Sequence, residues 1–492
     1  ARHVLVDRHE RQQVMMQRVV AAAEAAGGTF DPDPMLVDEN TSLVEEPHVV
    51  TGSFDPAFLE LPAAVIRAVA RGHQRYFCVQ KSDDELLPHY LAVVNTALRP
   101  DLITKGNDRV MRARLADARF FFEEDKKVPL EARVEKLAGI VFHNRLGSVR
   151  EKVDRLVKLA VLLAKELDVS LETRASIQRA AHLCKFDLVS LMVGEFPELQ
   201  GHMGRAYAKH AGEADIVADA LRDHYRPVGA SDAIAPGEVS AVVALADRLD
   251  TLTGCFAVGL SPTGAADPYA LRRACIAALR TILEAAESRP AYARLNLSTL
   301  VELAYAGYAG KKLDLSSQDT VAKVMEFAVE RLRGLVATAT SGTVADAILA
   351  TGARAAEKPA LTMVRARALQ AVVDGRQPWL EKAKLVAKRL GGISKQSPPV
   401  FHPRDAFSHG KKDDGAIVRL VEDADERTQD LSSITAVRTA LEYTSVLATR
   451  LDEIFLSTLI NDPADPDTSK RLELLSYGAQ CMLRIADFSR LS

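Results

Sequence analysis

From Ser148 onward, the chain places apolar residues three and four positions apart and fills the positions between them with charge. This spacing is typical of an amphipathic helix that buries one face. Ser148 and Glu151 have the spacing of a capping box, so they are predicted to start the first of these helices. The apolar stripe of that helix comprises Val149, Val153, Leu156, Ala160, Leu163 and Leu167. Further helices are predicted around 180–193 and 242–252, within 300–395, and over 431–460 and 468–488.

The first 145 residues or so have a different pattern, with runs rich in β-forming residues. Arg75–Val79 and Tyr90–Val94 flank the polar, proline-containing segment Lys81–Pro88. Two such runs around a polar segment predict a pair of strands. A helix is predicted over Asp108–Phe122. Three of its arginines share one face, and a charge run of this kind more often faces solvent than it contacts RNA.

These patterns predict a multidomain, mainly α protein. An α+β body is expected over 1–145, followed by an all-helical domain over 146–290 and a helical linker over 291–395. The breaker cluster Gly391–Pro399 separates the linker from a last all-helical domain over 396–492. No period of 20 to 50 residues recurs, which excludes a solenoid.

The composition of the chain and the motifs that it lacks narrow the range of possible functions. The five cysteines are scattered, odd in number and without a CxxC pair, which argues against a disulfide framework or a structural zinc site. The formal net charge is −3, so a nucleic-acid surface must be a local patch. No uncharged apolar run reaches the length of a membrane span. The chain lacks a phosphate loop, a dinucleotide fingerprint and the hydrolase motifs, so no catalytic residue is predicted.

Two basic elements are candidate anion contacts. In the run from Ser261 to Arg273, Pro262 and Gly264 set a turn, and Asp267 is predicted to be the N-cap of a helix with Pro268 at its first position. Arg272 and Arg273 then lie in the early turns, where the helix dipole does not favour cations, which indicates an anionic partner.

The second basic element is the segment 380–395. Lys384 and Lys388 are four residues apart and share a helix face, where they repel each other unless a partner neutralises them. Arg389 and Lys395 add to the same run. Phosphate contact and a solvated face explain this run about equally well.

Three ordered motifs carry a family resemblance: GEFPELQGHMGRAYA at 194–208, VALADRLDTLTG at 243–254 and GLSPTGAADPYALRR at 259–273. They resemble the beta subunit of the bacterial-type heterotetrameric glycyl-tRNA synthetase, and the similarity covers nearly the whole chain. The resemblance implies a fragment that lacks the N-terminal region of the family. It also implies a tRNA-binding subunit of a glycine–tRNA ligase that positions tRNA(Gly) for glycylation at the active site of a partner alpha subunit. An alpha2-beta2 assembly without membrane contact is expected, in the cytoplasm or, for a fused plastid form, inside an organelle. This chain is expected to bind no cofactor, whereas the complex uses ATP and Mg.

The helical segment 146–290 resembles the HD phosphohydrolase fold, in which a His-Asp doublet, a further His and a distal Asp hold a divalent metal. Here Cys184–Lys185 stands in the place of the doublet, and Asp247 corresponds to the distal Asp. An ammonium group offers no lone pair to a metal. His182, His202 and His210 are off pattern. A metal-free HD-like scaffold is therefore expected, and a metal-dependent nucleotide phosphohydrolase is the alternative function.

The segment 396–492 resembles the DALR-type anticodon-binding domain. In the preceding basic run, Gly392 stands where the beta-subunit family has an Asn. Base reading is expected in this last domain, because unpaired loops expose base edges. The residues predicted to bind tRNA are Arg272, Arg273, Lys384, Lys388, Arg389, Lys395, Arg471, Arg484 and Arg490.

Overall fold

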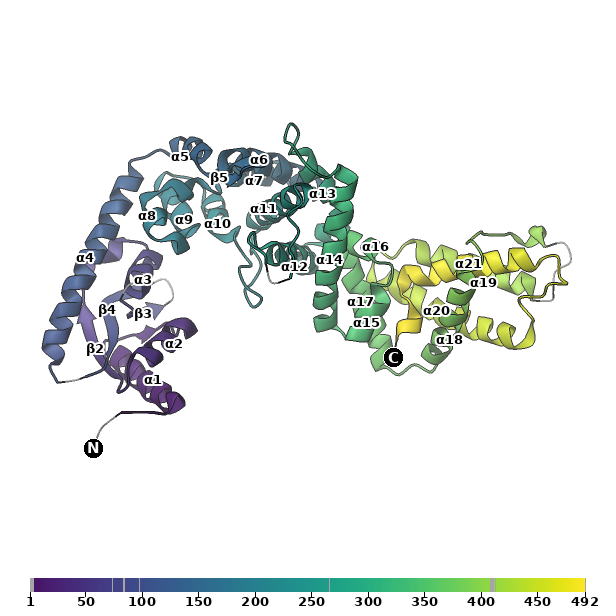
Figure 1. Ribbon diagram of the computed structural model, residues 1–492, viewed down its shortest axis with the longest axis horizontal. Coiled ribbons are helices and arrows are strands. Elements are labelled where there is room, and N and C mark those ends of the chain that lie inside the picture. The colour runs from purple at the N-terminus through teal and green to yellow at the C-terminus, as the bar shows by residue number, and fades with distance from the viewer. Residues whose placement is uncertain are drawn as a thin grey trace. The chain divides into compact units, whose positions relative to one another are not determined.

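A computed structural model describes residues 4–72, 74–82, 85–96, 98–264, 266–407, 411 and 413–491. The chain divides into two compact units. Unit 1 comprises Ala1–Asp154 and Ala175–Tyr225, and unit 2 comprises Arg155–Arg174 and Arg226–Ser492. Helices dominate both units, and a small antiparallel sheet lies near the N-terminus (Figure 1), which confirms the predicted fold class.

Unit 1 opens with the sheet and its covering helices. The sheet has the order β1-β3-β4-β2, and every neighbouring pair is antiparallel. The predicted pairing of two strands is confirmed by β3 and β4. Side chains of α1 and α2, including Met15 and Leu36, pack on Phe77, Val79 and Leu91 of the sheet to form one core. The elements are α1 (Arg8–Ala25), β1 (Thr29–Phe30), α2 (Pro34–Leu43), β2 (His48–Ser53), α3 (Ala63–Gly72), β3 (Phe77–Ser82) and β4 (Glu85–Val94).

A long helix, α4 (Pro100–Lys126), confirms the helix predicted over Asp108–Phe122 and extends it at both ends. Near its C-terminus, the buried carboxylate of Asp125 accepts hydrogen bonds from the N–H groups of Leu191 and Met192, both at 3.0 Å. It also accepts from the Tyr207 hydroxyl at 2.7 Å and from the Arg133 guanidinium at 2.9 Å. One carboxylate therefore ties α4 to three other elements: α5 (Leu130–Lys136), α8 (Leu191–Glu195) and α9 (His202–His210).

The predicted capping box is confirmed at the start of α6 (Val149–Glu166). The Ser148 N–H donates to Glu151 Oε2 at 2.7 Å, and the Glu151 N–H donates to Ser148 Oγ at 3.3 Å. All six residues of the predicted stripe are buried. The neighbouring elements are β5 (Val141–His143), β6 (Gly147–Ser148), α7 (Leu171–Leu183) and α10 (Asp215–Asp223).

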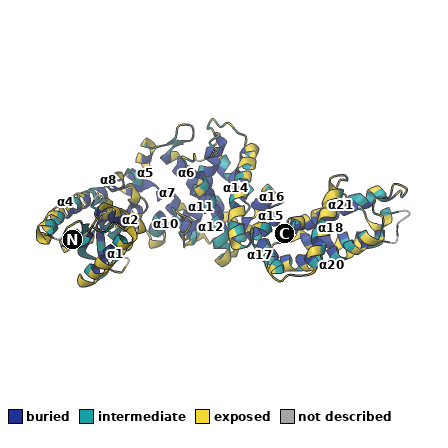
Figure 2. Ribbon diagram, turned by 60° about the horizontal axis from the view of Figure 1, so that its bottom comes forward, coloured by how far each residue is buried: buried dark blue, intermediate teal, exposed yellow. Residues whose placement is uncertain are grey.

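Unit 2 is built around α11 (Glu238–Ala257), which is buried along almost its whole length (Figure 2). The Arg155 guanidinium of α6 donates to both oxygens of Asp250 on α11, at 2.7 and 3.1 Å, and lies over the Tyr308 ring. Three helices pack against α11, namely α12 (Leu271–Ser288), α13 (Leu297–Ala306) and α14 (Ser317–Ala339). The helices α15 (Gly342–Ile348), α16 (Ala353–Glu357) and α17 (Pro359–Asp374) follow, and each packs against α14.

Four helices form the C-terminal bundle: α18 (Trp379–Ser394), α19 (Asp414–Gln429), α20 (Ile434–Ser457) and α21 (Thr468–Ile485). The last two confirm the long helices predicted there. The helix α18 continues through Gly391 and Gly392 to Ser394, and it packs against α20 and α21. Its basic residues therefore belong to the same bundle as the terminal helices.

Candidate nucleic-acid interface

The first predicted pair of arginines, Arg272 and Arg273, lies at the start of α12. The helix begins at Leu271, so the prediction that Asp267 is its N-cap and Pro268 its first residue is wrong. Asp267 still caps the helix from the preceding turn. That turn is closed by a hydrogen bond from the Ala270 N–H to the Asp267 carbonyl. Its two carboxylate oxygens accept from the N–H groups of Leu271 at 2.7 Å and Arg272 at 3.0 Å. Two of the free N–H groups of the helix start are therefore satisfied.

Arg272 and Arg273 lie in the first turn of α12, as predicted. The Arg272 guanidinium donates to the Gly264 carbonyl at 2.6 Å, which holds it along the preceding turn. Arg273 is exposed and forms no ion pair with any residue that the structure describes. An unpaired cation at the positive end of a helix dipole remains available to an anion.

The basic face of α18 divides into paired and unpaired cations. Lys384 pairs with Glu381 at 2.8 Å on the same helix. Arg389 lies 3.6 Å from Asp452 and over the Phe455 ring of α20. Lys388 and Lys395 are exposed, and neither forms an ion pair within the described part of the chain. Lys388 on this helix and Lys395 at its C-cap are therefore its most available phosphate contacts.

The terminal arginines have three different environments. Arg471 is fully buried, where its guanidinium donates to Asp414 at 2.9 Å and to Asp465 at 2.7 Å. This arginine is part of the fold and presents no surface to an RNA. Arg484 is partly buried and donates to Asp425 at 2.7 Å. Arg490 is half-exposed and pairs with Asp487 at 3.0 Å.

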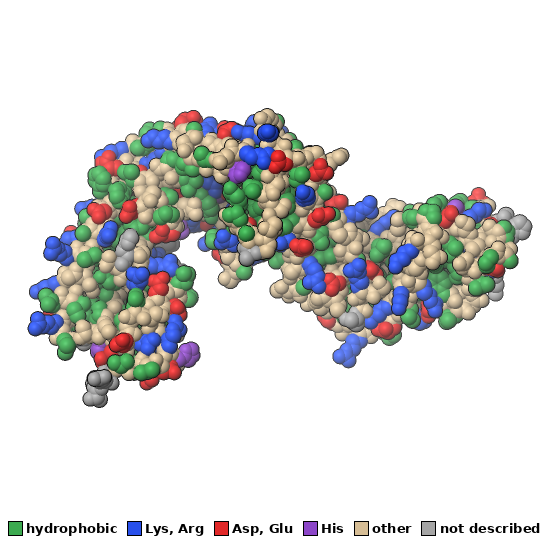
Figure 3. Space-filling view, viewed as in Figure 1, with side chains coloured by type: hydrophobic (Ala, Val, Ile, Leu, Met, Phe, Trp, Pro, Cys, Tyr) green, Lys and Arg blue, Asp and Glu red, His purple; other side chains and the backbone are tan. Residues whose placement is uncertain are grey.

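Lys and Arg side chains gather in separate groups with acidic residues between them, as the face in Figure 3 shows. One of these groups runs along α4, where the sequence predicted a charged helix face. The arrangement agrees with the small net charge of the chain, which requires any nucleic-acid contact to be local.

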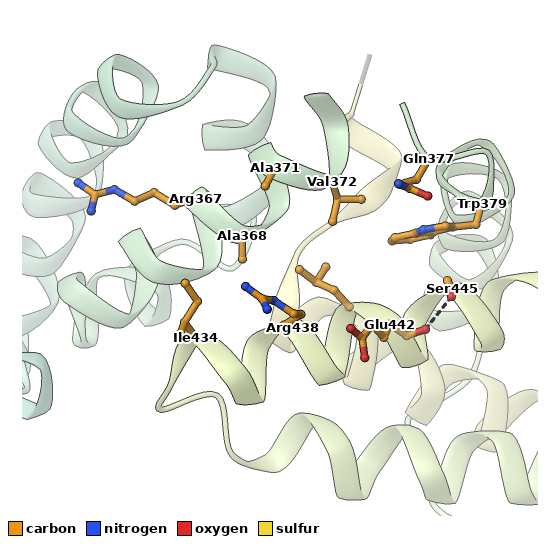
Figure 4. A pocket seen from close by; sticks show the side chains of 11 residues that line it. Arg367, Ala368, Ala371, Val372, Gln377, Trp379, Ile434, Arg438, Glu442 and Ser445 are labelled. Carbon is orange, nitrogen blue, oxygen red and sulfur yellow. Dashed lines mark hydrogen bonds between the residues drawn. The ribbon is translucent and has the colours of Figure 1, made fainter. Parts of the chain in front are cut away.

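A pocket that the sequence pattern did not indicate lies among α17, α18 and α20 (Figure 4). It has a volume of about 480 Å³. Trp379, the only tryptophan of the chain, lies at one side near Val372, and Arg438 rises from α20 toward Ala368 of α17. Arg438 is exposed and has no ion-pair partner among the described residues. An aromatic ring and a guanidinium are the groups on which unpaired bases stack.

Lys185 takes part in a buried polar cluster of unit 1. Its ammonium lies 2.9 Å from His224 Nε2 and over the Tyr225 ring. His182 lies 2.7 Å from Glu131. No group of three His, Cys, Asp or Glu side chains suited to a metal occurs among the described residues. The residues present do not fit a divalent metal, because an ammonium takes the place of a ligand.

Asp187 explains the spacing of the motif at 194–208. Its buried carboxylate accepts from the N–H groups of Gly201 at 2.6 Å and Gly204 at 3.0 Å, at the start of α9. Burial raises the pKa of Asp187, and these two N–H groups oppose that shift. Gly201 has a φ of +82°, and a Cβ on Gly204 would lie 3.2 Å from the Asp187 carboxylate. The two glycines therefore permit the close approach of the backbone to this carboxylate.

The described residues thus define a helical protein with exposed, unpaired cations on helix starts and faces, the class of protein that can hold a polyanion. Residues 1–350 match the family model described as glycyl-tRNA synthetase beta subunit. The chain belongs to the glycyl-tRNA synthetase beta subunit family, as its sequence motifs predicted. Among the described residues, none of the helices has the length and apolar character needed to cross a membrane.

Individual relatives agree with this assignment. The glycine–tRNA ligase beta subunit of Trichlorobacter lovleyi is 38% identical over 496 residues, which cover 99% of this chain and 69% of that protein. The beta subunit of Phenylobacterium zucineum is 37% identical over 498 residues, covering 100% of this chain and 70% of its own length. The beta subunit of Myxococcus xanthus is 50% identical over 282 residues, covering 57% and 40%.

Proposed function

We propose that this chain is the tRNA-binding subunit of a glycine–tRNA ligase. Membership of the beta-subunit family carries the proposal. A partner alpha subunit activates glycine with ATP and Mg, and this chain holds tRNA(Gly) and places its acceptor end. Holding a reactant in place contributes to rate through the entropy of positioning and needs no bond-making residue on this chain. The assembly is alpha2-beta2 and acts in the cytoplasm.

The distribution of free cations supports this role. Arg273, Lys388, Lys395 and Arg438 are exposed and unpaired within the described residues of unit 2. They lie on the motif helix α12, on α18 and beside the Trp379 pocket. A tRNA offers backbone phosphates to such cations and unpaired bases to an aromatic pocket. The chain also lacks any nucleotide-binding signature of its own.

The isolated chain is expected to form no glycyl-adenylate, because its sequence carries no ATP-site motif. Glycine-dependent exchange of pyrophosphate into ATP measures this step. The chain alone should show no exchange, and charging of tRNA(Gly) should require this chain together with an alpha subunit. Exchange catalysed by the chain alone would overturn the proposal, as would full charging by an alpha subunit without it.

Removing Lys388 and Arg389 together is expected to weaken the binding of all tRNAs alike. Phosphate contacts release counterions, so the slope of log affinity against log salt should fall by roughly one to two units. Affinity measured by filter binding at several salt concentrations gives this slope.

A matched control removes the same charge from two exposed arginines that are held by carboxylates at 2.7 and 2.8 Å. In the test variant, Lys388 has no ion-pair partner among the described residues, and Arg389 lies 3.6 Å from Asp452. In the variant Arg333→Ala/Arg450→Ala, the lost partners are Asp346 and Glu453. This control should keep the wild-type slope. If the Lys388→Ala/Arg389→Ala variant and the wild-type chain have equal slopes, the α18 cations face solvent and do not contact phosphate.

A further inference from the structure

A cavity of about 620 Å³, lined by both polar and apolar side chains, lies in unit 2, apart from the Trp379 pocket. The helices α16 and α17, the loop between α19 and α20, and α21 line it. Four cations face it, namely Arg354, Lys358, Arg365 and Arg484, together with the two carboxylates of Glu357 and Asp430. Cations therefore outnumber carboxylates in its lining by two.

Arg365 is the cation of this cavity that has a buried guanidinium nitrogen without a partner in the described part of the chain. Its guanidinium donates to the Arg484 carbonyl at 2.6 Å and to Thr362 Oγ1 at 3.0 Å. Its Nε is buried and has no hydrogen-bond partner among the described residues. No carboxylate of the described chain pairs with Arg365, and burial lowers its pKa with nothing to oppose the shift. Arg365 is partly buried, and a cation that is withdrawn from water is normally paired, so this guanidinium lacks the anion that its environment favours.

The other cations line the same cavity as Arg365. Arg354 and Lys358 are exposed, and neither forms an ion pair within the described residues. Arg484 is already paired with Asp425 at 2.7 Å, so it contributes little free charge or donor capacity. Asp430 is engaged by the Ser432 N–H at 2.8 Å. Neither of the two carboxylates in the lining lies within ion-pair distance of Arg365.

We infer that this cavity binds a backbone phosphate of RNA, with Arg365 at the inner contact and Arg354 and Lys358 at the outer ones. Phosphate oxygens accept hydrogen bonds from guanidinium groups in a strong, charge-assisted geometry. The volume exceeds that of one phosphate, and the side chains of Leu361, Leu431 and Leu483 also line the cavity. These apolar groups suit the sugar and base of the nucleotide that carries the phosphate. The identity of the RNA as tRNA rests on the proposed function.

The test measures tRNA affinity against salt for the full chain and three variants. Arg365→Gln removes the inner cation, Arg354→Ala/Lys358→Ala removes the outer pair, and Arg333→Gln removes an exposed cation paired with Asp346 as the control. Arg365→Gln should weaken binding roughly ten-fold or more, the scale of a charged hydrogen bond. The outer double variant should lower the salt slope by about two units. The control should match the wild-type chain.

Arg365→Gln also removes contacts within the fold, so its thermal melting curve is recorded beside the wild type. Arg354 and Lys358 are exposed and form no ion pair among the described residues, so the outer double variant keeps the test valid if Arg365→Gln unfolds. The inference is overturned if the wild-type chain binds tRNA and the outer double variant keeps the same tRNA affinity and the same salt slope. The proposed function still stands in that case. No tRNA binding by the wild-type chain overturns both.

A second arm separates an RNA phosphate from a free anion. Inorganic phosphate and AMP are titrated against the bound tRNA of the wild-type chain. Displacement by AMP at concentrations where phosphate has no effect supports a nucleotide of RNA in the cavity. Calorimetry measures the binding of inorganic phosphate directly. The assignment to RNA is overturned if inorganic phosphate binds tightly and if Arg354→Ala/Lys358→Ala abolishes that binding without changing tRNA affinity.

Discussion

Replacing Arg471 by alanine is expected to lower the free energy of unfolding by about 3–5 kcal/mol, because it leaves the buried carboxylate of Asp414 on α19 without its cation. Arg471 also pairs with Asp465 in the segment before α21, where Lys411 lies 3.8 Å from the same carboxylate. Urea unfolding followed by circular dichroism measures the change. Arg490→Ala is the control, because its pair with Asp487 is exposed and should contribute only about 0–1 kcal/mol.

The comparison also separates a role in the fold from a role in RNA binding. A folded Arg471→Ala protein with wild-type stability and weakened tRNA binding would contradict the structural role assigned to this arginine. Equal destabilisation by Arg471→Ala and Arg490→Ala would contradict it as well.

The second large effect is expected in unit 1. Asp125→Ala should cost about 3–5 kcal/mol, because it leaves the buried Arg133 unpaired and removes the acceptor of the Leu191 and Met192 N–H groups. Hydrogen exchange at Leu191 and Met192 locates the loss, since their amides donate directly to Asp125. These amides should exchange faster than those in the centre of α4.

Glu123→Ala provides the matched control on the same helix. Glu123 is exposed and pairs with Lys126 at 3.0 Å, so its removal should leave stability and exchange nearly unchanged. Unchanged exchange at Leu191 and Met192 in Asp125→Ala would show that the carboxylate does not hold α8 and α9 to α4.

Local patterns predicted local structure well. The capping box of Ser148 and Glu151, the stripe of α6 and the pairing of β3 with β4 each depend on residues close in sequence, and all three are confirmed. The family resemblance could also be predicted from the sequence, because its motifs are continuous stretches of residues that can be read in order along one chain.

Burial of charge was the part that the sequence could not predict. Arg471 has the same appearance in the sequence as an exposed arginine, and its partner Asp414 lies 57 residues away. The Trp379 pocket depends on α20 packing against α17 and α18, which no spacing along the chain reveals. Gly391 and Gly392 are helix breakers by propensity, but the packing of α18 on α20 and α21 outweighs that preference.

The position of Trp379 gives the chain an optical reporter of its own. It is the only tryptophan among 492 residues, and its indole lies at the side of the pocket among α17, α18 and α20. When the indole is excited, the measured fluorescence therefore comes from a single known residue. A ligand that enters this pocket lies beside the indole and changes its emission directly. Unlabelled RNA fragments can thus be ranked by intrinsic fluorescence, without attaching a dye to either molecule.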